Sequence, residues 1–349
     1  MSLISSCLKS HTSHRLSSPY RDAKFFVDYY GDFNYADKWI NAAFVGSETN
    51  FASGRGNADF SIYGLTGRGE AAKKGTAYMA IFMYIIREFE DALDDCQINC
   101  ISCNDDPVHA WDEGVAFYSG SLEGTDGSPT GVLFHELADK RCANFDTCID
   151  ENNSKSAIND ELFKLFNIGQ GQLLSGKCEE ARATKEKIVD LMYVPLIQGT
   201  IRYAYKVGEQ AGGEKDKAEG AVFAASILPR IHAESETAAA EIYNNMRVGA
   251  SSTDFKAVKK AFESVYGDLN IKCSDVGGLL NPEGDYYEGA SPCKDNSRVS
   301  SKVVVGATIG SIAGFIALAS IGFAWYKRGH SKKGMVQPSF HESTVKEMN

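Results

Sequence analysis

The sequence predicts an all-α protein: a helical-bundle ectodomain built from two similar halves, followed by a stalk and one C-terminal transmembrane helix. Three observations support this prediction. Apolar residues recur at a spacing near 3.6 residues, few stretches alternate with period two, and prolines are scarce before the apolar C-terminal segment. The chain has 349 residues, 43% of them hydrophobic, which is enough for a sizeable core and excludes a disordered protein.

Residues 75–96, GTAYMAIFMYIIREFEDALDDC, form the stretch around which the chain is organised. Residues 77–86 are apolar on every side, which predicts a central helix buried between other elements. Asp106-Pro107 combines an N-cap residue with proline at the first helical position, and this pair predicts a further helix that closes near Gly120.

A faint internal duplication relates the two halves of the chain. The start of the central helix matches residues 220–226 at an offset of 145, and residues 111–120 match residues 258–267 at an offset of 147. Because repeated sequence units fold as similar structural units, we predict an ectodomain over residues 20–272 that is made of two repeats, at about 20–150 and 160–272.

The acidic end of the central helix is the first candidate site. Glu88, Asp91 and Asp95 fall on one helical face, where a hard cation finds the oxygen ligands that it prefers. The alternative is a solvated helix end in which Arg87 pairs with Asp91.

Two histidines share helical faces with carboxylates. His109 lies on the face of Asp112 and Glu113, and His232 lies on the face of Glu236, four residues later. Pro229, three residues before His232, removes a backbone donor and is expected to kink the helix and free carbonyl groups. Both spacings suit metal ligation, and both also occur in purely structural contacts. Tyrosines offer further oxygen ligands, the alternative being core or rim aromatics: Tyr29, Tyr30, Tyr118 and Tyr203.

The C-terminal part of the chain predicts a membrane anchor. Residues 303–326 carry no charged side chain and are long enough to cross a hydrocarbon layer of about 30 Å. A cluster of lysine and arginine begins the tail, residues 327–349, which by the positive-inside rule is cytoplasmic. We therefore expect a type I single-pass protein of the plasma membrane, with a stalk at residues 273–302. Residues 1–19 form a stub without a proper apolar core for a signal peptide.

The glycines of the membrane segment suggest self-association. Gly306, Gly310 and Gly314 form a doubled GxxxG pattern, which allows two helices to approach closely and predicts a homodimer. The alternative is a helix that is merely rich in small residues.

Cysteine usage and charge both suit an extracellular domain. All nine cysteines precede the membrane segment, as expected where disulfides persist, and Cys273 with Cys293 is a plausible closing pair. Asn152 begins a glycosylation sequon. Residues 1–302 hold 31 of the 36 basic and 44 of the 46 acidic residues, a net charge of −13, which argues against a nucleic-acid partner and favours cations.

Several long motifs, in one order over most of residues 20–275, resemble the iron-assimilation proteins of green algae and the phytotransferrins of marine phytoplankton. They read WDEGVAFYSGSLEG, LADKRCANFDTC, KKGTAYMAIFMYIIREFEDALDDC and AEGAVFAASILPRIHAE. The resemblance implies a surface protein of an alga that captures ferric iron with carbonate for high-affinity uptake. It also implies a ferric reductase or the endocytic machinery as partner.

The resulting hypothesis is an iron site between the two repeats. Ferric ion favours carboxylate and phenolate oxygen with an occasional imidazole. The candidate metal ligands are Glu88, Asp91, Asp95, His109, Asp112, Glu113 and His232. A synergistic carbonate requires a cation beside the metal, for which the candidates are Arg55, Arg202 and Arg230.

Two rival classes stay open. A zinc enzyme that hydrates carbon dioxide requires His109, His135 and His232 to converge. The absence of a recognisable nucleophile–base motif argues against an enzyme. The other rival is an adhesion or scaffold ectodomain that binds no metal.

Overall fold

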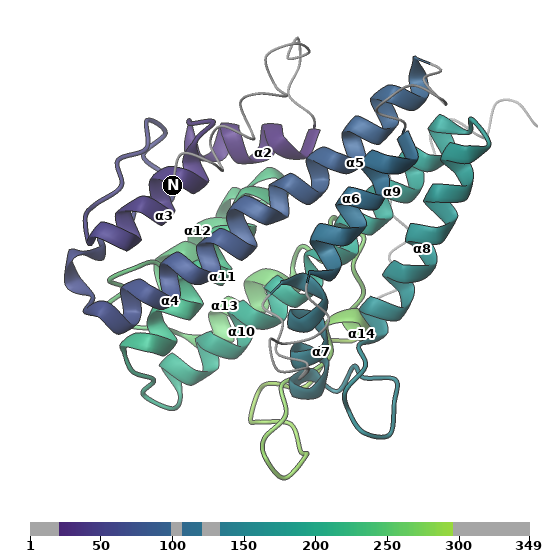
Figure 1. The fold of residues 1–349 in the computed structure, drawn as a ribbon. Coiled ribbons are helices and arrows are strands. Elements are labelled where there is room, and N and C mark those ends of the chain that lie inside the picture. The colour runs from purple at the N-terminus through teal and green to yellow at the C-terminus, as the bar shows by residue number, and fades with distance from the viewer. Residues whose placement is uncertain (1–20, 99–106, 121–132, 296–349) are drawn as a thin grey trace, which may run out of the picture. The chain divides into compact units, whose positions relative to one another are not determined.

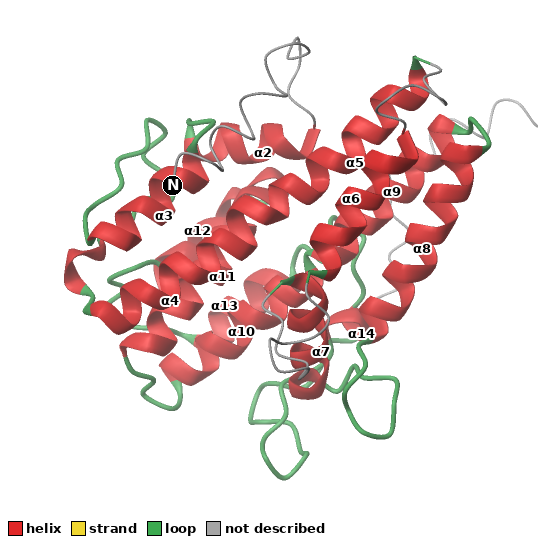
Figure 2. Ribbon diagram, in the orientation of Figure 1, coloured by secondary structure: helices red, strands yellow, loops and turns green. Residues whose placement is uncertain are grey.

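The computed structural model describes residues 21–98, 107–120 and 133–295 (Figure 1). Contacts divide the chain into residues 1–296 and residues 297–349, and every described residue belongs to the first unit. The described residues form helices joined by loops, with isolated β-bridges and no strand (Figure 2). The all-α prediction is confirmed for this part of the chain.

The elements of the first predicted repeat are α2 (Arg21–Tyr30), α3 (Tyr35–Val45), η1 (Phe60–Ile62), α4 (Leu65–Gly75), η2 (Thr76–Ile81), α5 (Phe82–Gln97), α6 (Pro107–Ser119) and α7 (Phe134–Phe145). They are followed by α8 (Ala157–Leu174), α9 (Cys178–Met192), α10 (Val194–Gly208), α11 (Glu214–Glu234), α12 (Glu236–Met246), α13 (Phe255–Glu263) and α14 (Cys273–Val276). The helix expected to begin at Pro107 and close near Gly120 is α6.

The predicted central helix is confirmed as η2 and α5, which continue directly from α4. Figure 1 shows α4 and α5 as one run with α11 beside α4. Thr76–Ile81 is a π-helical turn, a local departure that often marks functional sites. Its side chains Tyr78 and Met79 are buried, as is Phe82 at the start of α5, because other helices surround this run.

The start of α4 is held by the start of α11. The Glu214 carboxylate accepts backbone N–H donors from Gly64 (3.0 Å) and Gly67 (2.7 Å). These are groups that a helix N-terminus leaves without an intrahelical partner, and the negative charge also complements the positive end of the helix. This contact brings the two ends together over a long sequence separation.

Farther along, α11 contacts α4 and η2 through pairs of residues that are 145 positions apart in the sequence. Lys74 Nζ lies 3.1 Å from Glu219 Oε1, and the rings of Tyr78 and Phe223 stack with centroids 5.0 Å apart. The predicted duplication makes the members of each pair equivalent to one another. Their contact is the arrangement expected of two related halves packed face to face; the duplication itself stays a prediction.

Three disulfides link the described cysteines: Cys96–Cys178, Cys142–Cys148 and Cys273–Cys293. The predicted pairing of Cys273 with Cys293 is thus confirmed, and Cys96–Cys178 joins α5 to α9. Cys7, Cys100 and Cys103 lie outside the described residues.

The described part of the predicted stalk, residues 273–295, packs against the helices. Val276, Leu279 and Ala290 are buried, and the Gly278 N–H donates to the Phe145 carbonyl at the end of α7 (3.1 Å). Backbone hydrogen bonds of this kind need no side chain, so a Gly-rich segment can form them. The segment is therefore ordered although its composition resembles that of a linker.

The predicted stub, membrane segment with its three glycines, and tail lie outside the described residues. In the part of the chain that the structure describes, no helix has the length and apolar character needed to cross a membrane.

A buried ion network joins α2, α5 and α9. The Lys185 ammonium is 2.7 Å from Asp22 and 2.5 Å from Glu90, and Arg182 reaches Glu90 at 3.2 Å. Lys185 is 2% exposed, so its charge depends on these carboxylates rather than on water.

We expect Lys185→Met to destabilise the fold by about 3 to 5 kcal/mol, because it removes the cation that pairs with buried Asp22 and leaves buried Glu90 with Arg182 alone. Urea unfolding monitored by far-UV circular dichroism measures the change. Lys164→Met is the matched control, since Lys164 also pairs with an aspartate (Asp160, 2.6 Å) but is exposed, and its unfolding free energy should not change measurably. Equal effects in the two variants would contradict this account.

Candidate functional site

The predicted acidic face of α5 is buried in part and already contains a cation. Glu88 and Asp95 are 6% and 7% exposed. Arg87 Nη1 lies 3.5 Å from Glu88 and 3.4 Å from Asp91. The ion pair weighed as the alternative to a metal site therefore forms.

Helix α6 brings a further carboxylate, Glu113, near this face. The two helices pack closely because Gly114 lies against Phe89, where a Cβ atom would be 2.6 Å from the ring. His109 Nε2 is 3.2 Å from Glu113 Oε1. Burial raises the pKa of Glu88 to about 7, and the carboxylates of Glu113 and Asp91 add to the rise while Arg87 opposes it.

Other members of the predicted metal set have different partners. Asp112 accepts a hydrogen bond from Gln170 of α8 (2.8 Å), and His232 contacts Tyr29 and Glu236 instead of the α5–α6 carboxylates. Among the described residues, no group of three or more His, Cys, Asp and Glu side chains is arranged to hold a metal ion.

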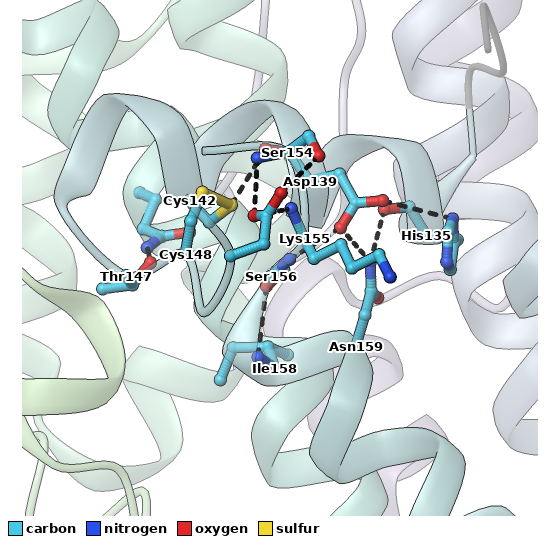
Figure 3. The surroundings of a disulfide bond; sticks show 12 residues. His135, Asp139, Cys142, Thr147, Cys148, Ser154, Lys155, Ser156, Ile158 and Asn159 are labelled. Carbon is cyan, nitrogen blue, oxygen red and sulfur yellow. Dashed lines mark hydrogen bonds and ion pairs between the residues drawn. A yellow bond between two sulfur atoms is a disulfide. The ribbon is translucent and has the colours of Figure 1, made fainter. Parts of the chain in front are cut away.

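The three histidines of the zinc-enzyme alternative lie on α6, α7 and α11 and have separate neighbours. His135 Nδ1 is 3.6 Å from Asp139 Oδ2, beside the Cys142–Cys148 disulfide (Figure 3). Asp139 also accepts from the Ser156 N–H and the Asn159 amide, each at 2.8 Å. These residues line a cleft of about 730 Å³. The contacts of Asp139 explain the local loop structure and give no reason for a zinc centre.

Pro229 leaves a carbonyl of α11 without its helical donor, as the sequence predicts; the expected kink stays a prediction. A regular helix would pair the N–H of residue 229 with the Ala225 carbonyl, and proline has no N–H. The freed carbonyl accepts a hydrogen bond from the Tyr30 hydroxyl (2.8 Å), and Tyr30 is fully buried. The proline therefore ties the end of α2 to α11 about two turns before His232.

His232 lies in an aromatic and charged environment formed by three elements. Its ring meets the Tyr29 ring edge-on with centroids 5.3 Å apart, and its Nε2 is 4.0 Å from Glu236 Oε1. Burial and then the charge of Arg55 lower the pKa of His232, with Glu236 acting in the opposite direction. The imidazole is consequently neutral at neutral pH, which is the form that binds metals.

Arg55 is held beside this ring by the loop between α3 and α4. Its Nε and Nη2 donate to the carbonyls of Tyr29 (3.0 Å) and Asp28 (2.7 Å). The next residue, Gly56, has φ +70°, and a Cβ there would be 2.2 Å from the Tyr30 ring. The glycine is thus needed for the loop to approach α2.

Tyr243 of α12 completes the set, which we term the Tyr29–His232 cluster: Tyr29, Arg55, His232, Glu236 and Tyr243. The Tyr243 hydroxyl donates to the Asn57 carbonyl (2.8 Å). Burial raises the pKa of Tyr29 well above its ordinary value; Tyr243 adds to this rise and Arg55 opposes it. Both phenols stay protonated unless a strong Lewis acid displaces the proton.

The remaining anion candidates lie elsewhere. Arg230 is buried and pairs with Glu234, with its Cζ 5.3 Å from the Phe25 ring centroid. Arg202 stands over the Tyr203 ring with its Cζ 5.2 Å from the centroid. Only Arg55 of the three predicted arginines belongs to the Tyr29–His232 cluster.

Sequence reasoning placed His232 and Arg55 in one hypothetical iron site, paired His232 with Glu236 by their spacing of four residues, and named Tyr29 as a possible oxygen ligand. It missed Tyr243. Tyr243 gave no signal, because only the packing of α12 against the loop brings it near.

Comparisons with protein-family models, curated proteins and solved structures give no match.

We expect Tyr30→Phe to destabilise the protein by about 1 to 3 kcal/mol, because it leaves the buried Ala225 carbonyl without a donor. In a Pro229→Ala background the restored N–H pairs with that carbonyl, so the same change should cost less than about 1 kcal/mol. A double-mutant cycle by urea unfolding measures this coupling. Additive effects would show that Tyr30 does not replace the missing donor.

The raised pKa of Glu88 predicts a loss of stability as the pH rises from about 4.5 to about 7. The folded state binds this proton up to about pH 7, whereas the ordinary value is 4.5, so the group's contribution falls as pH rises between these values. Between pH 5 and 8.5 the wild type should lose about 1 to 3 kcal/mol that Glu88→Gln does not lose. Unfolding free energies at both pH values, with exposed Glu180→Gln as control, provide the measurement. Parallel pH profiles for wild type and Glu88→Gln would exclude the effect.

Proposed function

We propose that this chain captures ferric iron at the cell surface, with carbonate as synergistic anion, for high-affinity iron uptake. The observation that supports the proposal best is the Tyr29–His232 cluster. Helix α2, the α3–α4 loop, α11 and α12 bring together phenol, imidazole and carboxylate groups and an arginine. The motif resemblance supports the same function independently of this geometry.

The chemistry of the cluster matches a small, highly charged cation. Ferric ion favours phenolate and carboxylate oxygen and accepts imidazole. His232 is already neutral, and Glu236 is 85% exposed, so it is free to turn toward a bound ion. The two phenols become ligands when iron displaces their protons.

Arg55 supplies the anion side of the proposed site. Its Nε and Nη2 are occupied by backbone carbonyls, which hold the guanidinium in place and leave Nη1 for an oxyanion. A guanidinium held in this way binds carbonate by charge-assisted hydrogen bonds. The arginine is exposed, so the anion reaches it from solvent.

Acid should release the iron. Protons compete with ferric ion for the phenolates, for His232 and for carbonate, and all three effects weaken binding as pH falls. Protonation lowers the iron affinity at each of these groups, because iron binds the deprotonated form in every case. An acidified compartment after internalisation would use this property.

The test is a ferric titration of the purified chain with and without bicarbonate, at pH 7.5 and pH 5. We expect tight binding at pH 7.5 with bicarbonate, a visible phenolate-to-iron charge-transfer band, and weaker binding at pH 5. Tyr29→Phe and His232→Ala should each weaken binding by more than about 100-fold and the first should diminish the band.

A matched variant separates the two candidate clusters. Asp91→Asn on α5 should retain wild-type affinity if the Tyr29–His232 cluster is the site. Loss of binding in Asp91→Asn alone would move the site to the α5–α6 carboxylates. Absence of tight ferric binding in both bicarbonate conditions would refute the proposed function.

A further inference from the structure

Arg141 of α7 is a buried cation with two guanidinium nitrogens that find no hydrogen-bond partner among the described residues. The side chain is 8% exposed, and its Nε and Nη1 atoms are buried and unpaired. Buried polar groups are almost always satisfied, and an unpaired charge away from water is strongly unfavourable. An unsatisfied guanidinium in a folded protein therefore indicates a water molecule or an ion that contacts it.

A second arginine accompanies it. Helix α10 packs against α7, and its Arg202 is close enough for its charge, after burial, to lower the pKa of Arg141 to about 10. Both groups stay charged at neutral pH. Within the described residues Arg202 has no carboxylate at ion-pair distance, and its guanidinium lies over the Tyr203 ring. Two like charges thus lie on helices that pack against each other.

The acids that act on these arginines do not neutralise both charges. Glu219 of α11 attracts both arginines, but its Oε1 is 3.1 Å from Lys74, and its buried Oε2 has no partner among the described residues. Asp216 also attracts Arg202, but it pairs with Lys206 at 2.6 Å. Tyr78, from the π-helical turn, faces the same region. Among the described residues, the surroundings therefore leave donors of Arg141 unused and give Arg202 no carboxylate at ion-pair distance.

We propose that Arg141 and Arg202 together bind one small oxyanion of the phosphate or sulfate class where α7, α10 and α11 meet. A guanidinium presents N–H donors in a planar fork that matches two oxygens of such an anion. A dianion balances both unpaired charges at once. Arg202 is partly exposed, which gives the anion access from solvent. The site requires no metal and is independent of the proposed iron site.

The alternative is an internal pair. A rotation of either side chain that joined Arg141 to Glu219 Oε2 would satisfy both buried groups without a ligand. The two cases differ in what happens when Arg141 is removed. Loss of an internal partner destabilises the protein, whereas loss of an unpaired buried cation does not.

The experiment measures the thermal midpoint of the purified, metal-free chain in chloride, phosphate, sulfate or bicarbonate at constant ionic strength. Wild type should gain several degrees in phosphate or sulfate, with saturation, because a ligand that binds only the folded state stabilises it. Arg141→Met should lose this gain while its midpoint in chloride does not fall. Arg202→Gln should weaken oxyanion affinity at least tenfold by calorimetry, and Glu219→Gln should strengthen it.

Arg247→Gln is the matched control, because Arg247 is exposed and lies over the Tyr243 ring at 6.0 Å. It should keep the full gain. A gain retained in both Arg141→Met and Arg202→Gln would place the anion elsewhere and overturn the proposal. No gain in wild type, with a lower chloride midpoint for Arg141→Met, would establish the internal pair. A response to bicarbonate alone would overturn the assigned anion class.

Discussion

The packing of α11 against the α4–η2–α5 run constrains the positions of the other elements. Phe223 of α11 is stacked between Tyr78 of η2 (5.0 Å) and Tyr203 of α10 (5.7 Å). Gly199 makes room for it, since a Cβ there would be 2.7 Å from the Phe223 ring. Because interiors are close-packed, this three-ring stack sets the spacing of three helices and thereby the positions of the charged residues beside it.

A single missing hydrogen-bond donor links this core to the candidate site. Pro229 leaves the Ala225 carbonyl unpaired within α11, and the Tyr30 hydroxyl of α2 satisfies it. The same contact places Tyr29, the neighbouring residue, against His232. A feature that would only weaken an isolated helix thus determines which side chains gather around its last turn.

The two buried cations Lys185 and Arg141 differ in whether neighbouring carboxylates compensate their charge. At Lys185 the buried cation and carboxylates satisfy one another, and such a network stabilises the folded state only while it is complete. At Arg141 the guanidinium is buried, and the described residues provide no such compensation. The contrast suggests that the first is structural and that the second is related to a ligand, since an uncompensated charge is rarely retained without a role.

The sequence alone determined the helical class, the central helix over residues 75–96, the helix that begins at Pro107 and the Cys273–Cys293 pair, because apolar period, capping residues and cysteine spacing are local signals. It also singled out Arg55, Tyr29 and His232 by residue type. Only the tertiary structure decided that these three lie together with Tyr243, that Arg87 occupies the acidic face of α5, and that residues 273–295 pack on the helices. Such contacts join residues far apart in the chain, and no local pattern encodes which distant faces meet.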